Sequence, residues 1–163
     1  MSRPGQDWFD RAPFGPSVEG GRRRTEAGLR FSCTMCGNCC TGAPGVVDLD
    51  EDEADALADH LGMDRSRFDA GYTKFVDGRR SLTERLTAFG YDCVFLDRTT
   101  IPGRAVCGVY DHRPSQCRTW PFWKSNLASE RSWATAASGC PGMNRGTFVP
   151  ADRVRIIRDS SPA

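Results

Sequence analysis

The sequence lacks long apolar runs and carries almost no net charge. No stretch approaches the roughly 18 consecutive apolar residues of a membrane-spanning helix. Residues 1–21, MSRPGQDWFDRAPFGPSVEGG, contain no apolar segment of the kind a secretory signal needs. The 22 basic and 21 acidic residues leave a formal charge of +1. We therefore expect a cytoplasmic protein that binds neither membrane nor nucleic acid, while an unknown protein partner stays open.

Aliphatic residues are also scarce. Leu, Ile, Val and Phe together number 29 of the 163 residues, which is about 18% and less than globular domains usually contain. Disordered chains of this composition also have a high net charge, which is not found here. A folded chain with so few core-forming residues usually needs disulfides or bound metal to hold it together.

Cysteine, by contrast, is abundant. Four of the eight cysteines occur within residues 33–40, with the spacing C-x-x-C-x-x-C-C, and Gly37 permits a tight turn between them. A reducing compartment disfavours disulfides, whereas thiolates are ligands of zinc and of iron–sulfur clusters. We therefore predict metal binding over a disulfide scaffold, with these candidate ligands: Cys33, Cys36, Cys39, Cys40, Cys93, Cys107, Cys117 and Cys140.

The spacing also suggests how the ligands divide. The C-x-x-C-x-x-C run is typical of [4Fe–4S] ferredoxins, in which a remote Cys-Pro can supply another ligand, and Cys140-Pro141 offers one here. Neighbouring side chains in an extended segment point apart, so we expect Cys39 and Cys40 to serve different sites, or only one of them to bind. Our hypothesis is two sets: Cys33, Cys36, Cys39 and Cys140 at one site, and Cys40, Cys93, Cys107 and Cys117 at the other.

Charged residues near the cysteines give two further interpretations. Four thiolates around a divalent ion leave a net charge of about −2, whose burial requires compensation. Arg113 and Arg118 flank Cys117 and could supply it at a bound cofactor, or they could be ordinary surface residues. His112 is a weaker candidate ligand than the thiols, and we interpret His60 as a solvated helix end.

Periodicity and turn signals predict a small α+β domain of short helices and one β-hairpin, held together by Cys-ligated metal. Asp50 and Glu53 form a capping-box pattern, and they favour a helix that ends before Gly62 over a calcium loop. Ala54, Leu57, Ala58 and Leu61 recur at helical spacing and are expected to form the apolar face of this helix. We also expect a helix over Asp64–Phe75 with Phe68, Tyr72 and Phe75 inward, and a turn at Asp77-Gly78. A turn or short helix is expected at Cys117, and a helix over Ser129–Ala137 with Trp133 buried, whereas Ser81–Ala88 is ambiguous. Tyr91–Tyr110 is predicted to be a hairpin that brings Cys93 near Cys107. Residues 28–150 form the predicted domain, with a flexible tail over 1–27 and a short strand or polar tail over 151–163.

The cysteine pattern resembles a known family. The run of residues 33–40, then Cys93-Val94-Phe95-Leu96, then residues 107–118 (CGVYDHRPSQCR), then Cys140-Pro141-Gly142 are similar to the YkgJ family of bacterial cysteine-cluster proteins. This family is also described as a zinc- or iron-chelating CxxCxxCC domain. The resemblance covers residues 30–143 and implies a zinc or iron site. A related domain occurs in flagellin lysine N-methylase, so the resemblance leaves open an iron–sulfur enzyme or enzyme component that modifies proteins.

Overall fold

The computed structural model describes residues 6–11, 13–19 and 22–163, with side chains from 6 to 11 and from 27 onward. The described part is α+β, as predicted, and every strand pair in it is antiparallel. Its strands are β1 (Pro13–Glu19), β2 (Arg22–Phe31), β3 (Thr73–Val76), β4 (Arg79–Leu82), β5 (Glu84–Thr87), β6 (Gly90–Cys93), β7 (Leu96–Asp97), β8 (Val106–Cys107) and β9 (Met143–Pro150).

The helices are short. The α-helices are α1 (Glu51–His60), α2 (Arg65–Tyr72), α3 (Ser115–Arg118), α4 (Lys124–Leu127), α5 (Glu130–Ser138) and α6 (Ala151–Ser160), and the 3-10 helices are η1 (Trp8–Arg11), η2 (Asn38–Cys40) and η3 (Tyr110–His112). The described helices include none that is both long and apolar enough to cross a membrane.

The chain divides into two compact units. We call Met1–Thr34, Thr119–Ser161 and Ala163 the flanking unit, and Met35–Arg118 with Pro162 the middle unit. Each unit has its own apolar core, and each is described by itself below.

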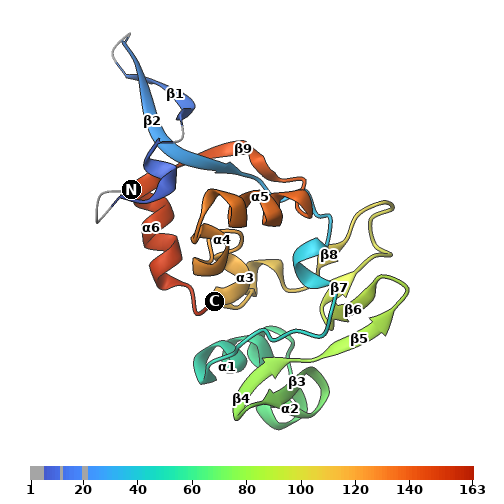
Figure 1. The fold of residues 1–163 in the computed structure, drawn as a ribbon. Coiled ribbons are helices and arrows are strands. Elements are labelled where there is room, and N and C mark those ends of the chain that lie inside the picture. Colours follow the sequence, from blue (N-terminus) through green and yellow to red (C-terminus); the bar gives the residue numbers. More distant parts are fainter. Residues whose placement is uncertain (1–5, 12, 20–21) are drawn as a thin grey trace. The chain divides into compact units, whose positions relative to one another are not determined.

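The flanking unit is built around the sheet β1-β2-β9, with α6 packed against β2 and β9 (Figure 1). Its core contains Phe9 of η1, Leu29 of β2 and Val154 of α6, and Phe122 stacks on Trp133 of α5 with ring centroids 5.8 Å apart. Trp133 is buried in a helix capped by the side chain of Ser129, so the prediction for this helix is confirmed.

Residues 151–160 correct one prediction. The segment that we expected to be a strand or polar tail is the helix α6. Ala151 and Val154 recur at helical spacing and are buried, while Arg155 and Arg158 form ion pairs with Asp7 beside η1. Few apolar residues mark this helix, so its partners in distant parts of the chain decide its structure.

At the N-terminal end, residues 6–11 of the predicted tail include the buried Phe9. The remainder of that tail, up to residue 26, has no described side chains. The limits of the domain stay a prediction.

The middle unit begins with the two predicted helices. Helix α1 has the full capping box between Asp50 and Glu53, and Gly62 follows it with a φ of 64°. Its predicted apolar face is buried at Ala54, Leu57 and Ala58. Helix α2 begins as predicted but ends at Tyr72, three residues before the expected end.

The early end of α2 has a clear cause. The turn at Asp77-Gly78, in which both residues have positive φ, folds Thr73–Val76 back onto Arg79–Leu82 as the hairpin β3–β4. Strand alternation then directs Phe75 outward, where it is 65% exposed and lies under the guanidinium of Arg80. The prediction that Phe75 points inward was therefore wrong, whereas Phe68 is buried as expected.

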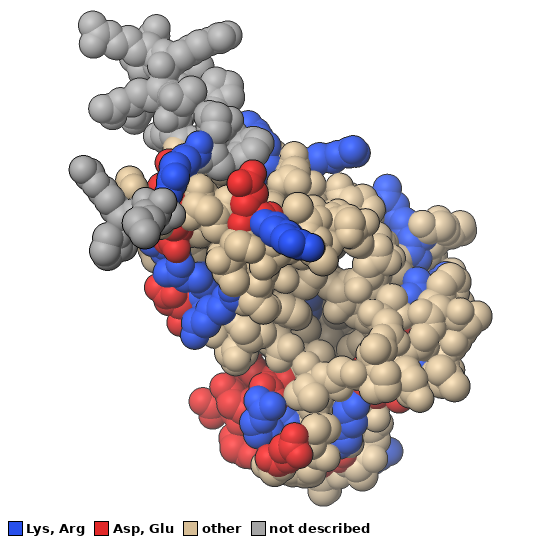
Figure 2. Space-filling view, viewed as in Figure 1, with Lys and Arg blue, Asp and Glu red and all other residues tan. Residues whose placement is uncertain are grey.

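The predicted Tyr91–Tyr110 hairpin forms, but over a shorter stretch than expected. Cys93 ends β6 and pairs with Glu84 of β5, not with Cys107. A separate short ladder pairs Leu96 of β7 with Cys107 of β8. The preceding segment 84–87, which the sequence left ambiguous, provides the nearer and longer partner for β6. Figure 2 shows acidic and basic side chains gathered over α1 and α2.

Val154 and Ile156 test whether α6 is part of the folded core. Val154 is fully buried and Ile156, two residues later, is 58% exposed. We expect Val154→Asp to lower the free energy of unfolding by on the order of 3–5 kcal/mol, because it buries an unpaired charge. The matched variant Ile156→Asp should stay within about 0.5 kcal/mol of the parent. Urea denaturation of both variants measures this, and equal stabilities would show that α6 does not contribute to the core.

Candidate metal centre

The cysteine run is shaped by Gly37. This residue precedes η2 with a φ of 76°, and its carbonyl accepts a hydrogen bond of 2.9 Å from the Cys40 amide. A Cβ at Gly37 would lie 2.6 Å from the Cβ of Ala105. The Ala105 amide also donates to the carbonyl of Met35 at 2.8 Å. The segment 35–42, which we call the cysteine loop, therefore packs directly against the segment that leads into Cys107.

Cys39 and Cys40 do not have the extended backbone that we expected. They lie in the 3-10 helix η2 and not in an extended segment, and their Sγ atoms are 3.5 Å apart. Two thiolates on one tetrahedral zinc, with bonds of about 2.3 Å, have sulfurs about 3.8 Å apart. The expectation that these two side chains point apart was wrong, and the observed spacing suits shared ligation of one ion.

Three further thiols of the middle unit belong to the same electrostatic neighbourhood. Cys93 ends β6, Cys107 lies in β8 and Cys117 lies in α3, and all three are half-buried. The charge of Cys93 acts on Cys40, and that of Cys107 acts on both Cys93 and Cys117. Four separate segments thus bring five thiols into mutual interaction: Cys39, Cys40, Cys93, Cys107 and Cys117.

This setting determines the protonation of the thiols. Burial raises the pKa of Cys93 to about 11 and that of Cys117 to about 12. A hydrogen bond between the neighbouring thiols lowers the pKa of Cys39 to about 7 and raises that of Cys40. Without a cation, most of this group is therefore protonated at neutral pH, because several adjacent thiolates would repel one another in a poorly solvated place.

The five thiols are neighbours, but they do not surround a common point. Among the described residues, no three His, Cys, Asp or Glu side chains are arranged so that they could hold a metal ion as they stand. Cysteine side chains change direction by rotation about a single χ1 bond, so rotamer changes alter the distances between these thiols. The donor chemistry and the Cys39–Cys40 spacing fit zinc or iron.

The remaining predicted ligands lie in different surroundings. Cys33 is exposed and Cys140 is buried in the apolar core of the flanking unit, whereas Cys36 is half-buried in the middle unit. None of the eight cysteines, all of which lie in the described part of the chain, forms a disulfide. The division of the eight into two ligand sets stays a prediction.

The two histidines contact each other. The rings of His60 and His112 stack with centroids 3.8 Å apart, which joins the end of α1 to η3. Their exposure agrees with the solvated position expected for His60.

The two arginines singled out from the sequence differ in position. Arg113 lies over the ring of Tyr110, and its charge acts on Cys39 and Cys117, where it opposes the rise in the pKa of Cys117. Arg118 donates to the carbonyl of Arg113 and lies 4.0 Å from a carboxylate oxygen of Glu53. Their role at a bound cofactor stays a prediction, and the electrostatic contact favours Arg113.

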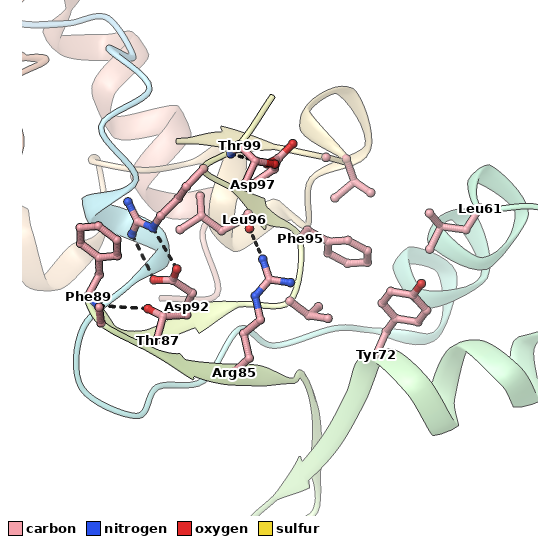
Figure 3. Close-up of a pocket in the computed structure, with 15 residues that line it drawn as sticks. Leu61, Tyr72, Arg85, Thr87, Phe89, Asp92, Phe95, Leu96, Asp97 and Thr99 are labelled. Carbon is pink, nitrogen blue, oxygen red and sulfur yellow. Dashed lines mark hydrogen bonds and ion pairs between the residues drawn. The ribbon is translucent and has the colours of Figure 1, made fainter. Parts of the chain in front are cut away.

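Sequence reasoning missed a third arginine. Arg98 forms an ion pair with the buried Asp92, and the hydroxyl of Thr41, next to Cys40, donates to the same carboxylate. Nothing in the local sequence marks either residue, because Asp92 is one strand residue among others and Arg98 lies in a loop. Both line a groove of about 690 Å³ in the middle unit, which Figure 3 shows with Tyr72 and Phe95 further along it.

Comparison with known families agrees with this picture. The model of the family "CxxCxxCC: Putative zinc- or iron-chelating domain" matches residues 32–141, which include all eight cysteines. The chain belongs to this family. The family match supports metal binding in general and leaves the metal open between zinc and iron. No solved structure matches the chain.

Gly37 and Gly78 separate backbone strain from packing in the cysteine loop. Their φ angles are 76° and 77°, but a Cβ at Gly78 meets nothing within 4 Å. We expect Gly78→Ala to lower the free energy of unfolding by about 1–2 kcal/mol through strain alone. Gly37→Ala should cost clearly more and weaken zinc binding, because its methyl group displaces the loop from Ala105. Thermal denaturation and zinc titration check this, and equal effects of the two variants would contradict it.

The raised thiol pKa values predict that metal binding depends on pH. A metal bound by Cys93 and Cys117 would displace their protons, because pKa values of about 11 and 12 keep both thiols protonated at pH 7. Apparent zinc affinity should therefore rise with pH between about 6 and 9, by up to about 100-fold per pH unit if both protons leave. Competition with a chelator of known proton stoichiometry measures this, and an affinity independent of pH would exclude these two thiols as ligands.

Proposed function

We propose that the middle unit is a metal-binding module that holds zinc or iron through thiolates from four segments of the chain. The candidate ligands of this ion are Cys39, Cys40, Cys93, Cys107 and Cys117, of which a tetrahedral site takes four. The observation that carries the proposal is the mutual interaction of these five thiols, of which two have sulfurs 3.5 Å apart. Once these thiols lose their protons, a bound cation offsets the repulsion between the thiolates.

The sulfur spacing favours a single ion over a cluster. In a [4Fe–4S] cluster each thiolate binds a different iron, so the cysteine sulfurs lie farther apart than two ligands of one ion. The 3.5 Å between Cys39 and Cys40 is close to the separation of about 3.8 Å at one tetrahedral zinc. The alternative, an iron–sulfur protein, is favoured by the C-x-x-C-x-x-C spacing of Cys33, Cys36 and Cys39.

An enzymatic role is the second candidate. If only three of the thiols bind the metal, it keeps a fourth position for water or substrate, as catalytic zinc sites do. The groove beside Asp92 and Arg98 could admit a substrate to such a position. The family resemblance would then suggest an enzyme or enzyme component in protein modification, such as lysine methylation.

Metal analysis with an absorption spectrum distinguishes these functions. The protein is purified anaerobically, and metal content, acid-labile sulfide and visible absorption are measured on one sample. We expect zinc or iron without sulfide. Iron together with stoichiometric sulfide and a broad visible band would establish the iron–sulfur alternative instead. A protein that neither contains nor takes up either metal would refute the proposal.

Serine variants test the ligand set. We expect Cys93→Ser, Cys107→Ser and Cys117→Ser each to lower the affinity for the same ion by at least about 100-fold, because a thiolate ligand is lost. Cys33→Ser, at an exposed position of the flanking unit, is the matched control and should leave that ion bound. If Cys33→Ser and Cys40→Ser each removed the same single ion, the two-set hypothesis would be wrong.

A further inference from the structure

Asp92 is almost fully buried and is held by one partner in particular. It is 1% exposed, and its two carboxylate oxygens accept hydrogen bonds of 2.9 and 3.1 Å from Nε and Nη2 of Arg98. This bidentate geometry fixes the plane of the guanidinium as well as its position. The arginine also holds the pKa of Asp92 down at about 2, so the pair stays ionic at neutral pH.

The Asp92–Arg98 pair interacts with the cysteine loop in three ways. The Thr41 hydroxyl donates to Asp92, and Thr41 directly follows Cys40. The charge of Arg98 interacts with the Cys40 thiolate. A Cβ at Gly37 would lie 3.5 Å from Nη1 of Arg98. The guanidinium therefore lies beside Gly37, before η2, and Asp92 links it to Thr41, directly after η2, the helix that carries Cys39 and Cys40.

The hairpin β5–β6 holds the pair against the loop. The ring of Phe89, in the turn of this hairpin, lies 4.1 Å from the guanidinium carbon of Arg98, and Figure 3 shows Phe89 close to Asp92. The Tyr91 amide donates to the carbonyl of Gly42 at 2.8 Å, and a Cβ at Gly90 would lie 2.6 Å from the same oxygen. A side chain at Gly90 would thus push the hairpin away from the cysteine loop.

We propose that Arg98, oriented by Asp92 and Phe89, is a positioning residue of the metal centre. It holds the loop of Cys39 and Cys40 in place and presents a positive charge to the thiolate that binds metal. This inference rests on the proposed function. A centre of thiolates with net negative charge needs such a charge nearby, and hydrogen-bonded partners around ligands typically change metal affinity 10- to 100-fold.

Substitutions at Arg98 separate its charge from its geometry. Arg98→Gln removes both, whereas Arg98→Lys keeps the charge but cannot form the two parallel bonds to Asp92. We expect zinc affinity to fall at least about 10-fold in Arg98→Gln and by an intermediate factor in Arg98→Lys. Arg79→Gln is the matched control, since Arg79 forms an exposed ion pair with Asp48 in the same unit, and its affinity should match the parent's.

Three measurements on the full chain are needed. Competition with a chromophoric chelator gives zinc affinity, chelator-driven release gives the dissociation rate, and the absorption spectrum of the cobalt(II)-substituted protein reports the thiolate environment. Cobalt bands should shift in Arg98→Gln and not in Arg79→Gln, an effect that a purely structural role would not produce. Phe89→Leu, at a 64% exposed position, provides a variant that should fold even if Arg98→Gln does not. It should release zinc faster than the parent.

The outcomes distinguish this inference from the proposed function. A parent protein that binds neither zinc nor iron refutes both. A parent that binds zinc, with Arg98→Lys and Phe89→Leu folded and equal to it in affinity, release rate and cobalt spectrum, overturns the role of Arg98 alone. Loss of affinity in Arg79→Gln equal to that in Arg98→Gln would also overturn it, because the effect would then be one of total charge.

Discussion

The mutual repulsion of neighbouring thiolates is the constraint on which the middle unit depends. Burial raises the pKa values of Cys93 and Cys117. The hydrogen bond between Cys39 and Cys40 lowers the pKa of Cys39 and raises that of Cys40. As thiolates, five such groups placed together destabilise the folded chain unless a cation joins them. Metal binding and the final packing of these segments are therefore expected to form one coupled equilibrium.

The architecture around the thiols keeps their segments within reach of one another. Short ladders, β5–β6 and β7–β8, end at Cys93 and Cys107, and close backbone approaches fasten the cysteine loop to them. These approaches require glycine: Gly37 faces Ala105, and Gly90 faces the carbonyl of Gly42. Cys93 and Cys107 pack against the apolar core of this unit, which includes Leu57, Phe68 and Phe95. Metal therefore supplements a modest core that already exists.

Charge near the thiols comes from two kinds of arginine. Arg113 lies within a motif next to Cys117, so sequence proximity was enough to suggest it, and the structure places its charge near Cys39 and Cys117. Arg98 depends on Asp92, six residues earlier, and on a hairpin turn that brings Phe89 over it. The position of such an arginine beside the thiols can be recognised only once the pairing of the strands is known.

The sequence by itself determined the features that depend on neighbours along the chain. These are the cysteine spacing and family, the capping box of α1, the turn at Asp77-Gly78 and the helix around Trp133. Only the tertiary structure decided that Cys93 pairs with Glu84, that Phe75 faces outward and that the arginine-rich residues 151–160 form a helix against the sheet. The physical reason is the same in each case. Strand partners, burial and long-range ion pairs such as Arg155 with Asp7 join residues far apart in the chain, so their free energy leaves little trace in local sequence.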